Sequence, residues 1–185
     1  MHKKIAVIGT MGLPAKYGGF ETLVEHLTKE LHQDFDITVY CSAKSYSEKL
    51  VTFNNCKLHY INMEANGMQS ILYDMRAIFH ALKYADVLLI LGVSGCITLP
   101  FIKLFSRKKI IVNIDGLEWK RQKWNRFAKW FLKYSEQLAV KHSDIIFVPI
   151  QTPHGDKFEG TTRIPDERED FDYNYLIDGL TQLDY

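Results

Sequence analysis

Short apolar runs separated by helical patterns are the feature that most restricts the fold of this chain. Residues 87–91 are entirely apolar, and residues 110–114 are nearly so. Strands that are apolar on both faces are typical of a parallel sheet covered by helices on both sides. Strand-like runs occur also at 5–9, 37–41, 58–61 and 145–150, and helical apolar spacing occurs at 21–31, 70–84 and 127–138. The pattern predicts an α/β fold with a Rossmann-like parallel sheet of about six strands and helices on both faces.

The composition excludes several classes of protein. The 185 residues carry a net charge of +1, which does not indicate a nucleic-acid binder. The three scattered cysteines predict neither a disulfide scaffold nor a zinc cluster, and the dispersed histidines predict no metal site. The apolar stretch at the amino terminus is too short for a signal peptide, and no run is long enough to span a membrane. We therefore expect a cytoplasmic protein without a metal or other cofactor.

The chain changes character after residue 150. Residues 151–170 form a polar segment that contains Pro and Gly, and residues 171–185 show the spacing of an amphipathic helix. We expect a Rossmann-like domain at 1–150, followed by an appendage of loop and helix at 151–185.

Charge is distributed unevenly along the chain. Residues 103–133 contain ten Lys or Arg against two acidic residues, whereas residues 154–185 contain nine Asp or Glu against three basic residues. The two segments could pair with each other, or the basic one could face phosphates or an anionic membrane.

A glycine-rich segment joins the first predicted strand to the first predicted helix. The spacing of its glycines matches neither the dinucleotide-binding fingerprint nor the P-loop. In open α/β sheets, ligands bind beyond the carboxyl ends of strands, and a helix N-terminus there attracts anions. The alternative is a turn that only reverses the chain. The polar neighbours favour a binding loop, whose candidate residues are Gly12, Lys16, Tyr17, Gly18, Gly19 and Glu21.

A second candidate segment follows residues 110–114. Asp115 and Glu118 have oxygens that can bind sugar hydroxyls, and Trp119 has a ring on which a sugar can stack. Alternatively, Asp115 caps the next helix with Glu118 as its capping-box partner. The basic residues of this segment could meet a diphosphate or form a solvated surface; they are Lys120, Arg121 and Lys123.

Both segments resemble a known family. Residues 6–27 read AVIGTMGLPAKYGGFETLVEHL, and residues 113–124 read NIDGLEWKRQKW. They resemble the amino-terminal domain of bacterial rhamnosyltransferase-type glycosyltransferases, which are family 4 retaining enzymes built from two Rossmann domains (the GT-B fold). The resemblance extends over about residues 1–142.

This resemblance implies transfer of a sugar from a nucleotide-sugar donor to a saccharide or lipid-linked acceptor, in capsule or exopolysaccharide synthesis. The first loop would hold an acceptor or donor phosphate through backbone N–H groups and Lys16, and Asp115, Gly116 and Glu118 would bind sugar hydroxyls. The pattern assigns no catalytic base. Because only one half of the enzyme is expected in 1–150, activity would require a partner that supplies the second domain.

The predicted helix at 127–138 is rich in aromatic and basic residues. Its apolar stripe consists of Trp124, Phe127, Phe131, Tyr134 and Leu138, with Trp130 beside it and Lys or Arg on its flanks. Packing of this stripe against the core is the favoured interpretation. The alternative is that the helix lies in the interfacial layer of an anionic membrane, at the inner face of that membrane.

Residues 144–185 resemble a different family. The segments 146–155 and 158–165 are similar to part of a UDP-glucose/GDP-mannose dehydrogenase, in which the threonine matching Thr152 lies beside the nicotinamide dinucleotide. That family's glycine-rich phosphate loop is absent here, so NAD binding would depend on this tail alone. The resemblance to the glycosyltransferases ends, and the resemblance to the dehydrogenases begins, near residues 142–147. A fragment or fusion of an NAD-dependent dehydrogenase is therefore one alternative function, and a non-catalytic module that binds a nucleotide sugar or a membrane surface is another.

Overall fold

The chain is described here by a computed structural model. It describes residues 2–16, 18–114, 118–120, 122 and 124–147. The appendage predicted at 151–185, which includes Thr152, lies outside the described residues, as do Tyr17, Asp115 and Gly116.

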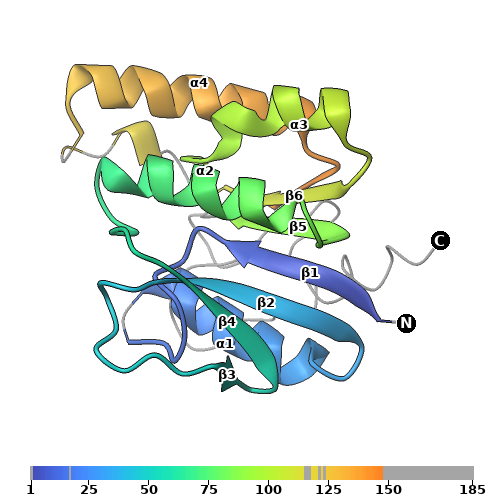
Figure 1. Ribbon diagram of the computed structural model, residues 1–185. Helices are drawn as coiled ribbons and strands as arrows, with labels where there is room; N and C mark the ends of the chain where they lie inside the picture. Colours follow the sequence, from blue (N-terminus) through green and yellow to red (C-terminus); the bar gives the residue numbers. More distant parts are fainter. Residues whose placement is uncertain (1, 17, 115–117, 121, 123, 148–185) are drawn as a thin grey trace, which may run out of the picture.

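Seven strands form one sheet in the order β3-β4-β2-β1-β5-β6-β7 (Figure 1). All neighbouring strands are parallel except β3 and β4, which are antiparallel. The predicted α/β class and Rossmann-like sheet are thereby confirmed, and the two-residue strand β3 extends one edge. The strands are β1 (Lys3–Ile8), β2 (Phe35–Ser42), β3 (Thr52–Phe53), β4 (Cys56–Ile61), β5 (Val87–Leu91), β6 (Lys109–Asn113) and β7 (Ile145–Phe147).

Helices cover both faces of this sheet. In Figure 1, α1 lies on one side of the sheet, and α2, α3 and α4 lie on the other. The α-helices are α1 (Gly19–Leu31), α2 (Gln69–Ala81), α3 (Leu99–Phe105) and α4 (Arg126–His142), and the short 3-10 turns are η1 (Cys96–Thr98) and η2 (Glu118–Lys120).

The alternation of side chains along each strand divides the core in two. Ile5 and Val7 of β1 pack in the cluster beneath α1, whereas Ala6 and Ile8 pack in the cluster beneath the other helices. Successive side chains of a strand point to opposite faces. Both faces are covered, so central strands such as β5 have no polar position, and this explains the apolar run at 87–91.

The strand order places a topological switch between β1 and β5. The connection after β1 leads into α1 on one face, whereas the connection after β5 leads through η1 to α3 on the other (Figure 1). Ligands of open α/β sheets bind outside the carboxyl ends of the strands at such a point. The glycine-rich loop after β1 lies there, as predicted from its place in the sequence.

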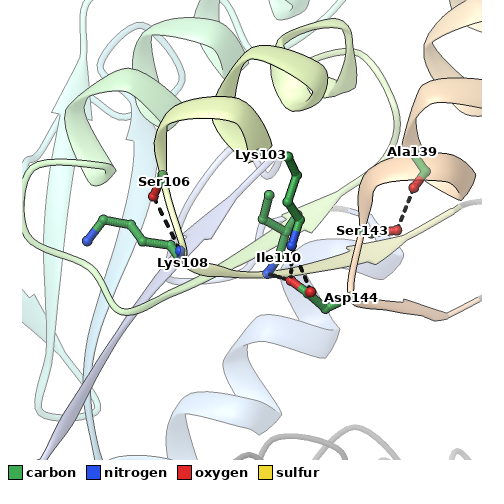
Figure 2. Close-up of polar contacts among 7 residues, drawn as sticks. All are labelled: Lys103, Ser106, Lys108, Ile110, Ala139, Ser143 and Asp144. Atoms are coloured by element: carbon green, nitrogen blue, oxygen red, sulfur yellow. Dashed lines mark hydrogen bonds and ion pairs between the residues drawn. The ribbon is translucent and has the colours of Figure 1, made fainter.

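The opposite, amino-terminal edge is fixed by aspartates that precede strands. The Asp86 carboxylate accepts a hydrogen bond from the Lys4 amide at 2.9 Å, and Asp144 accepts one from the Ile110 amide at 2.8 Å (Figure 2). Lys103 of α3 also donates to both oxygens of Asp144, at 2.7 and 2.6 Å. Although burial raises the pKa of Asp144, the bonds from Lys103 and Ile110 outweigh it, and the pKa lies below its usual range.

Helix α4 is oriented differently from the prediction. Its buried residues are small or aliphatic: Ala128, Leu132, Ser135 and Ala139. Phe127 is 64% exposed and Tyr134 is 43% exposed, so the prediction that these two face the core is wrong. Small residues let α4 approach its neighbours closely. Phe127, Trp130 and Tyr134 are left on the outside, whereas Trp124 and Phe131 of the predicted stripe pack partly buried against the core.

Candidate functional site

The loop between β1 and α1 begins against the end of β5. Gly9 has a φ of 94°, and a Cβ atom there would lie 1.9 Å from the carbonyl oxygen of Leu91. Only glycine fits such a close backbone approach with a positive φ. Gly12 also packs tightly, since a Cβ atom there would lie 2.6 Å from the Cys41 sulfur. These two glycines set the path of the loop over the carboxyl edge of the sheet.

Glu21 of α1 holds the first half of this loop. Its Oε1 atom accepts hydrogen bonds from the Thr10 hydroxyl and the Met11 amide, both at 2.8 Å. The Gly12 amide in turn donates to the Thr10 hydroxyl at 3.1 Å. Glu21, which was expected to contact substrate, is only 5% exposed and is engaged with the loop. Its position therefore indicates a role in shaping the loop.

The second half of the loop is tied to α1 and to the segment after β2. The Ala15 amide donates to Glu25 at 3.0 Å, and the Tyr46 hydroxyl donates to the Pro14 carbonyl at 2.9 Å. Lys16, predicted to hold a phosphate, donates from Nζ to the Ser45 carbonyl at 3.0 Å and lies 4.3 Å from the centre of the Tyr46 ring. The amides of Met11, Gly12 and Ala15 are thus engaged within the protein.

The N-terminus of α1 differs from the loop that precedes it. Its N-cap residue Gly18 has a φ of 116° and provides no side-chain capping bond. The Gly18 carbonyl accepts from the Thr22 amide at 3.2 Å and from the Thr22 hydroxyl at 3.1 Å. Gly18 and Gly19 are both exposed. The N-cap glycine itself offers no capping side chain, and the positive end of a helix dipole attracts anions. The Glu21 carboxylate already supplies one negative charge in this first turn, since its Oε2 atom would lie 2.1 Å from a Cβ atom at Gly18.

Asp74 of α2 lies behind the loops that follow β1 and β5. It is 2% exposed, and the Ser94 hydroxyl donates a short hydrogen bond to its Oδ2 atom. Within the described part of the chain, its Oδ1 atom has no hydrogen-bond partner. Burial raises the pKa of Asp74 to about 7, and the bond from Ser94 opposes this rise. The adjacent Tyr73 hydroxyl donates to the Thr10 carbonyl at 3.0 Å, so α2 links both loops.

Asp74 was not among the residues predicted from the sequence to form a site. The available signal was its spacing, because Asp74 lies three and four residues before Ala77 and Ile78 on the buried face of α2. A carboxylate on such a face is rarely buried without a specific role.

The end of β6 carries another buried acceptor. Asn113 is 3% exposed, and its Oδ1 atom has no hydrogen-bond partner among the residues that the structure describes. Its carbonyl accepts from the Gly92 amide at 2.8 Å, which joins the end of β6 to the end of β5. Asp115 and Gly116, which follow Ile114, lie outside the described residues, and Glu118 begins η2. The described ends of β1, β5 and β6 therefore lie together at one edge.

Trp119 of η2 does not present a free ring face. It packs partly buried against the core cluster beneath α2, α3 and α4. The Nζ atoms of Lys133 and Lys120 lie 5.2 and 5.5 Å from the centre of its ring. These cation–π contacts occupy the ring that was expected to stack on a sugar.

Two features of the described residues bear on ligands and membranes. Within them, no group of three or more His, Cys, Asp or Glu side chains is placed to hold a metal ion. Among the helices that the structure describes, none is both long and apolar enough to cross a bilayer.

A comparison with solved structures identifies a similar fold. The chain resembles a sucrose-phosphate synthase from Thermosynechococcus elongatus with a TM-score of 0.59 and 13% sequence identity. The similarity covers 80% of this chain but only 42% of the synthase. This similarity shows that the two proteins share a fold over the matched residues, and the chain spans less than half of the synthase's length. Among curated proteins, none matches the chain.

The sequence itself matches one family over most of its length. The family is described as a domain of unknown function, DUF1972, and the match covers residues 2–153. Since this is well over half of the 185 residues, the chain belongs to the DUF1972 family.

Proposed function

We propose that this chain is the amino-terminal half of a glycosyltransferase that transfers a sugar, as rhamnosyltransferases do, from a nucleotide-sugar donor to a saccharide or lipid-linked acceptor in polysaccharide synthesis. The observation that carries this proposal is the start of α1, where two exposed glycines, Gly18 and Gly19, begin the helix at the switch point of the sheet. A diphosphate or sugar phosphate is the ligand class that such a helix start attracts.

The loop supports this function because its own polar groups are already paired. Glu21 and Glu25 hold the amides of Met11 and Ala15, so the loop is ordered before a ligand arrives. A loop that is already ordered adds no further cost of ordering when a ligand binds beside it. We assign phosphate binding to the exposed start of α1, at Gly18 and Gly19, with Lys16 and Tyr17 adjacent in the sequence.

Sugar hydroxyls are assigned to the segment after β6. Asp115, Gly116 and Glu118 would bind them, next to the buried Asn113. Carboxylates and amides are suited to hydroxyl groups because they accept hydrogen bonds at more than one lone pair. No residue is assigned as catalytic base.

A second domain is part of this proposal. The chain spans 42% of the synthase whose fold it shares. Transfer between two bound substrates needs a closed site that orients them and excludes water. We therefore expect transfer only when a second half is present, whether from a partner or from a longer chain, and we propose 1–150 and 151–185 as the units of this sequence.

Two other functions compete with this proposal. NAD-dependent dehydrogenation rests on the tail alone, and Thr152 lies outside the described residues. A non-catalytic module that binds a nucleotide sugar would use the same start of α1 without performing transfer. Binding of NAD, or binding of a nucleotide sugar without transfer in the completed enzyme, would favour these alternatives.

The test uses a charge placed at the start of α1. Gly19→Asp adds a carboxylate where an acid favours the helix but repels a phosphate. Gln69→Glu adds the same charge at the first residue of α2 and serves as the matched control. Calorimetric titration of the whole chain would use UDP-, dTDP- and GDP-sugars, a lipid-linked saccharide, and NAD.

We expect one of the nucleotide sugars or the lipid-linked saccharide to bind. Gly19→Asp should weaken that binding at least tenfold, and Gln69→Glu should leave it unchanged. Circular dichroism would verify that both variants fold. The proposal fails if no sugar phosphate binds, alone or with acceptor, or if the two variants behave alike.

A further inference from the structure

An aromatic surface covers the outside of α4. Phe127, Trp130 and Tyr134 lie on the face opposite the buried residues Ala128 and Leu132, and Trp130 is 62% exposed. The rings contact one another, because the centre of the Trp130 ring lies 6.0 Å from that of Tyr134, in a parallel stack, and 6.0 Å from that of Phe127. The described residues place no further element over these rings.

The neighbouring helix α3 exposes apolar side chains as well. Phe101, Leu104 and Phe105 are 58%, 75% and 70% exposed, although Leu99 and Ile102 of the same helix are buried. The rings of Phe101 and Phe105 lie 4.7 Å apart. Helices α3 and α4 pack side by side in the layer at the top of Figure 1. We call the exposed residues of the two helices the α3–α4 face.

Basic residues surround the aromatic rings on this face. The helical period places Arg126 and Lys141 on the outer side of α4 with Trp130, and both are exposed. Lys133 is exposed as well, but its Nζ atom lies over the Trp119 ring. The only acidic residue of α4 is Glu136, which is half-buried, and burial raises its pKa. Helix α3 contains no acidic residue, and Arg107 just after it is exposed.

We propose that the α3–α4 face binds the surface of an anionic phospholipid bilayer, with its aromatic rings in the interfacial layer and its Lys and Arg side chains on the lipid phosphates. Aromatic side chains with basic neighbours are typical of helices that lie in this interface. Each Lys or Arg near an anionic surface adds to the attraction. The inference rests on this face alone and does not depend on the sugar-transfer proposal.

The charge on the face favours a bilayer over a second copy of the chain. A symmetric dimer through this face would bring the two sets of basic residues together without acidic partners, and like charges across an interface oppose association. An anionic bilayer instead supplies negative charge to every basic residue at once.

The test is co-sedimentation of the whole chain with vesicles of phosphatidylcholine, alone or mixed with phosphatidylglycerol. The double variant Arg126→Gln/Lys141→Gln removes charge from the face, and Lys44→Gln/Lys49→Gln removes the same charge from exposed lysines elsewhere. Trp130→Ser removes an aromatic ring from the face, and Val51→Ser removes another exposed apolar side chain elsewhere.

We expect binding to the anionic vesicles only, at least tenfold weaker after either change to the face and unchanged in both controls. Salt should weaken the binding because screening shortens the reach of charges. Absence of binding to anionic vesicles, equal binding to both vesicles, or equal losses in the control variants would overturn the proposal. So would a dimer in gel filtration that Trp130→Ser dissociates, because it would assign the face to a second copy.

Discussion

The loop after β1 and the α3–α4 face differ in how far their groups are paired within the protein. In the loop, the amides of Met11, Gly12 and Ala15 are paired with side chains of the same protein. On the α3–α4 face, rings such as Trp130 lie in solvent, and within the described residues no element covers them. The loop is therefore ordered by bonds within the protein, whereas the face would need an external surface to bury its apolar area.

The largest loss of stability should follow from replacing Gly9, the glycine at which the loop begins. In Gly9→Ala, the new methyl group would clash with the Leu91 carbonyl and the backbone would be strained, so we expect a loss of about 4 kcal/mol in the free energy of unfolding. Gly67→Ala is the control, since Gly67 also has a positive φ but open space around it; it should cost only about 1 kcal/mol. Urea denaturation measures both, and equal losses would show that the loop does not need this close approach.

The next effect concerns the carboxylate that holds the loop. Glu21→Ala leaves the Thr10 hydroxyl and the Met11 amide without their acceptor, and we expect a loss of about 3 kcal/mol. Glu21→Gln, which keeps one acceptor oxygen, should recover part of the loss. The exposed Glu30 provides the control, because Glu30→Ala should change stability by less than about 0.5 kcal/mol. A Glu21→Ala protein as stable as Glu30→Ala would contradict the role assigned here.

Asp74 should make the stability of the site region depend on pH. Its folded-state pKa of about 7 lies above that of the unfolded chain, so the folded protein holds the proton more tightly. The stabilisation is complete below about pH 4 and is lost as the pH rises through about 7, with a slope of up to about 1.4 kcal/mol per pH unit.

Asp74→Asn removes this titration and should flatten the stability profile between these pH values. Denaturation at a series of pH values measures the slope, and Asp34→Asn, at an exposed aspartate, is the control. A profile unchanged by Asp74→Asn would show that this carboxyl does not titrate in that range.

The smallest effect on stability is expected on the outer face. Trp130→Ser should change the free energy of unfolding by less than about 0.5 kcal/mol, because the ring is mostly in solvent. Leu132→Ala, two residues away on the buried side of α4, should cost about 3 kcal/mol. Thermal denaturation of the pair would sharpen the comparison. A large loss for Trp130→Ser would mean that the folded chain itself covers the ring.

Much of the fold could be predicted from apolar patterns, because buried strands tolerate few polar residues. The predicted strand at 87–91 coincides with β5, and the helices predicted at 21–31 and 70–84 correspond to α1 and α2. Helix α3 was missed because its seven residues are too few to show a helical period, and Pro100 lies among them.

The orientation of α4 and the hydrogen bonds of the site could not be predicted from the sequence, because both depend on tertiary contacts. Large side chains suggested a buried stripe, but the small residues Ala128 and Ala139 determine how closely α4 packs. Likewise, the location of the glycine loop followed from its place after β1, whereas the bonds from Thr10 and Met11 to Glu21 depend on how the loop folds back on α1. Such contacts have no signature in the local sequence.

The packing of Gly12 on Cys41 makes the reactivity of the Cys41 thiol depend on the position of the loop. The Cys41 thiol is fully buried, and burial raises its pKa to about 11, so it stays protonated and shielded from alkylating reagents. Reagent reaches this sulfur only when the segment above it lifts away. The rate of Cys41 alkylation therefore measures how often the loop opens, and a ligand that holds the loop closed would slow that reaction.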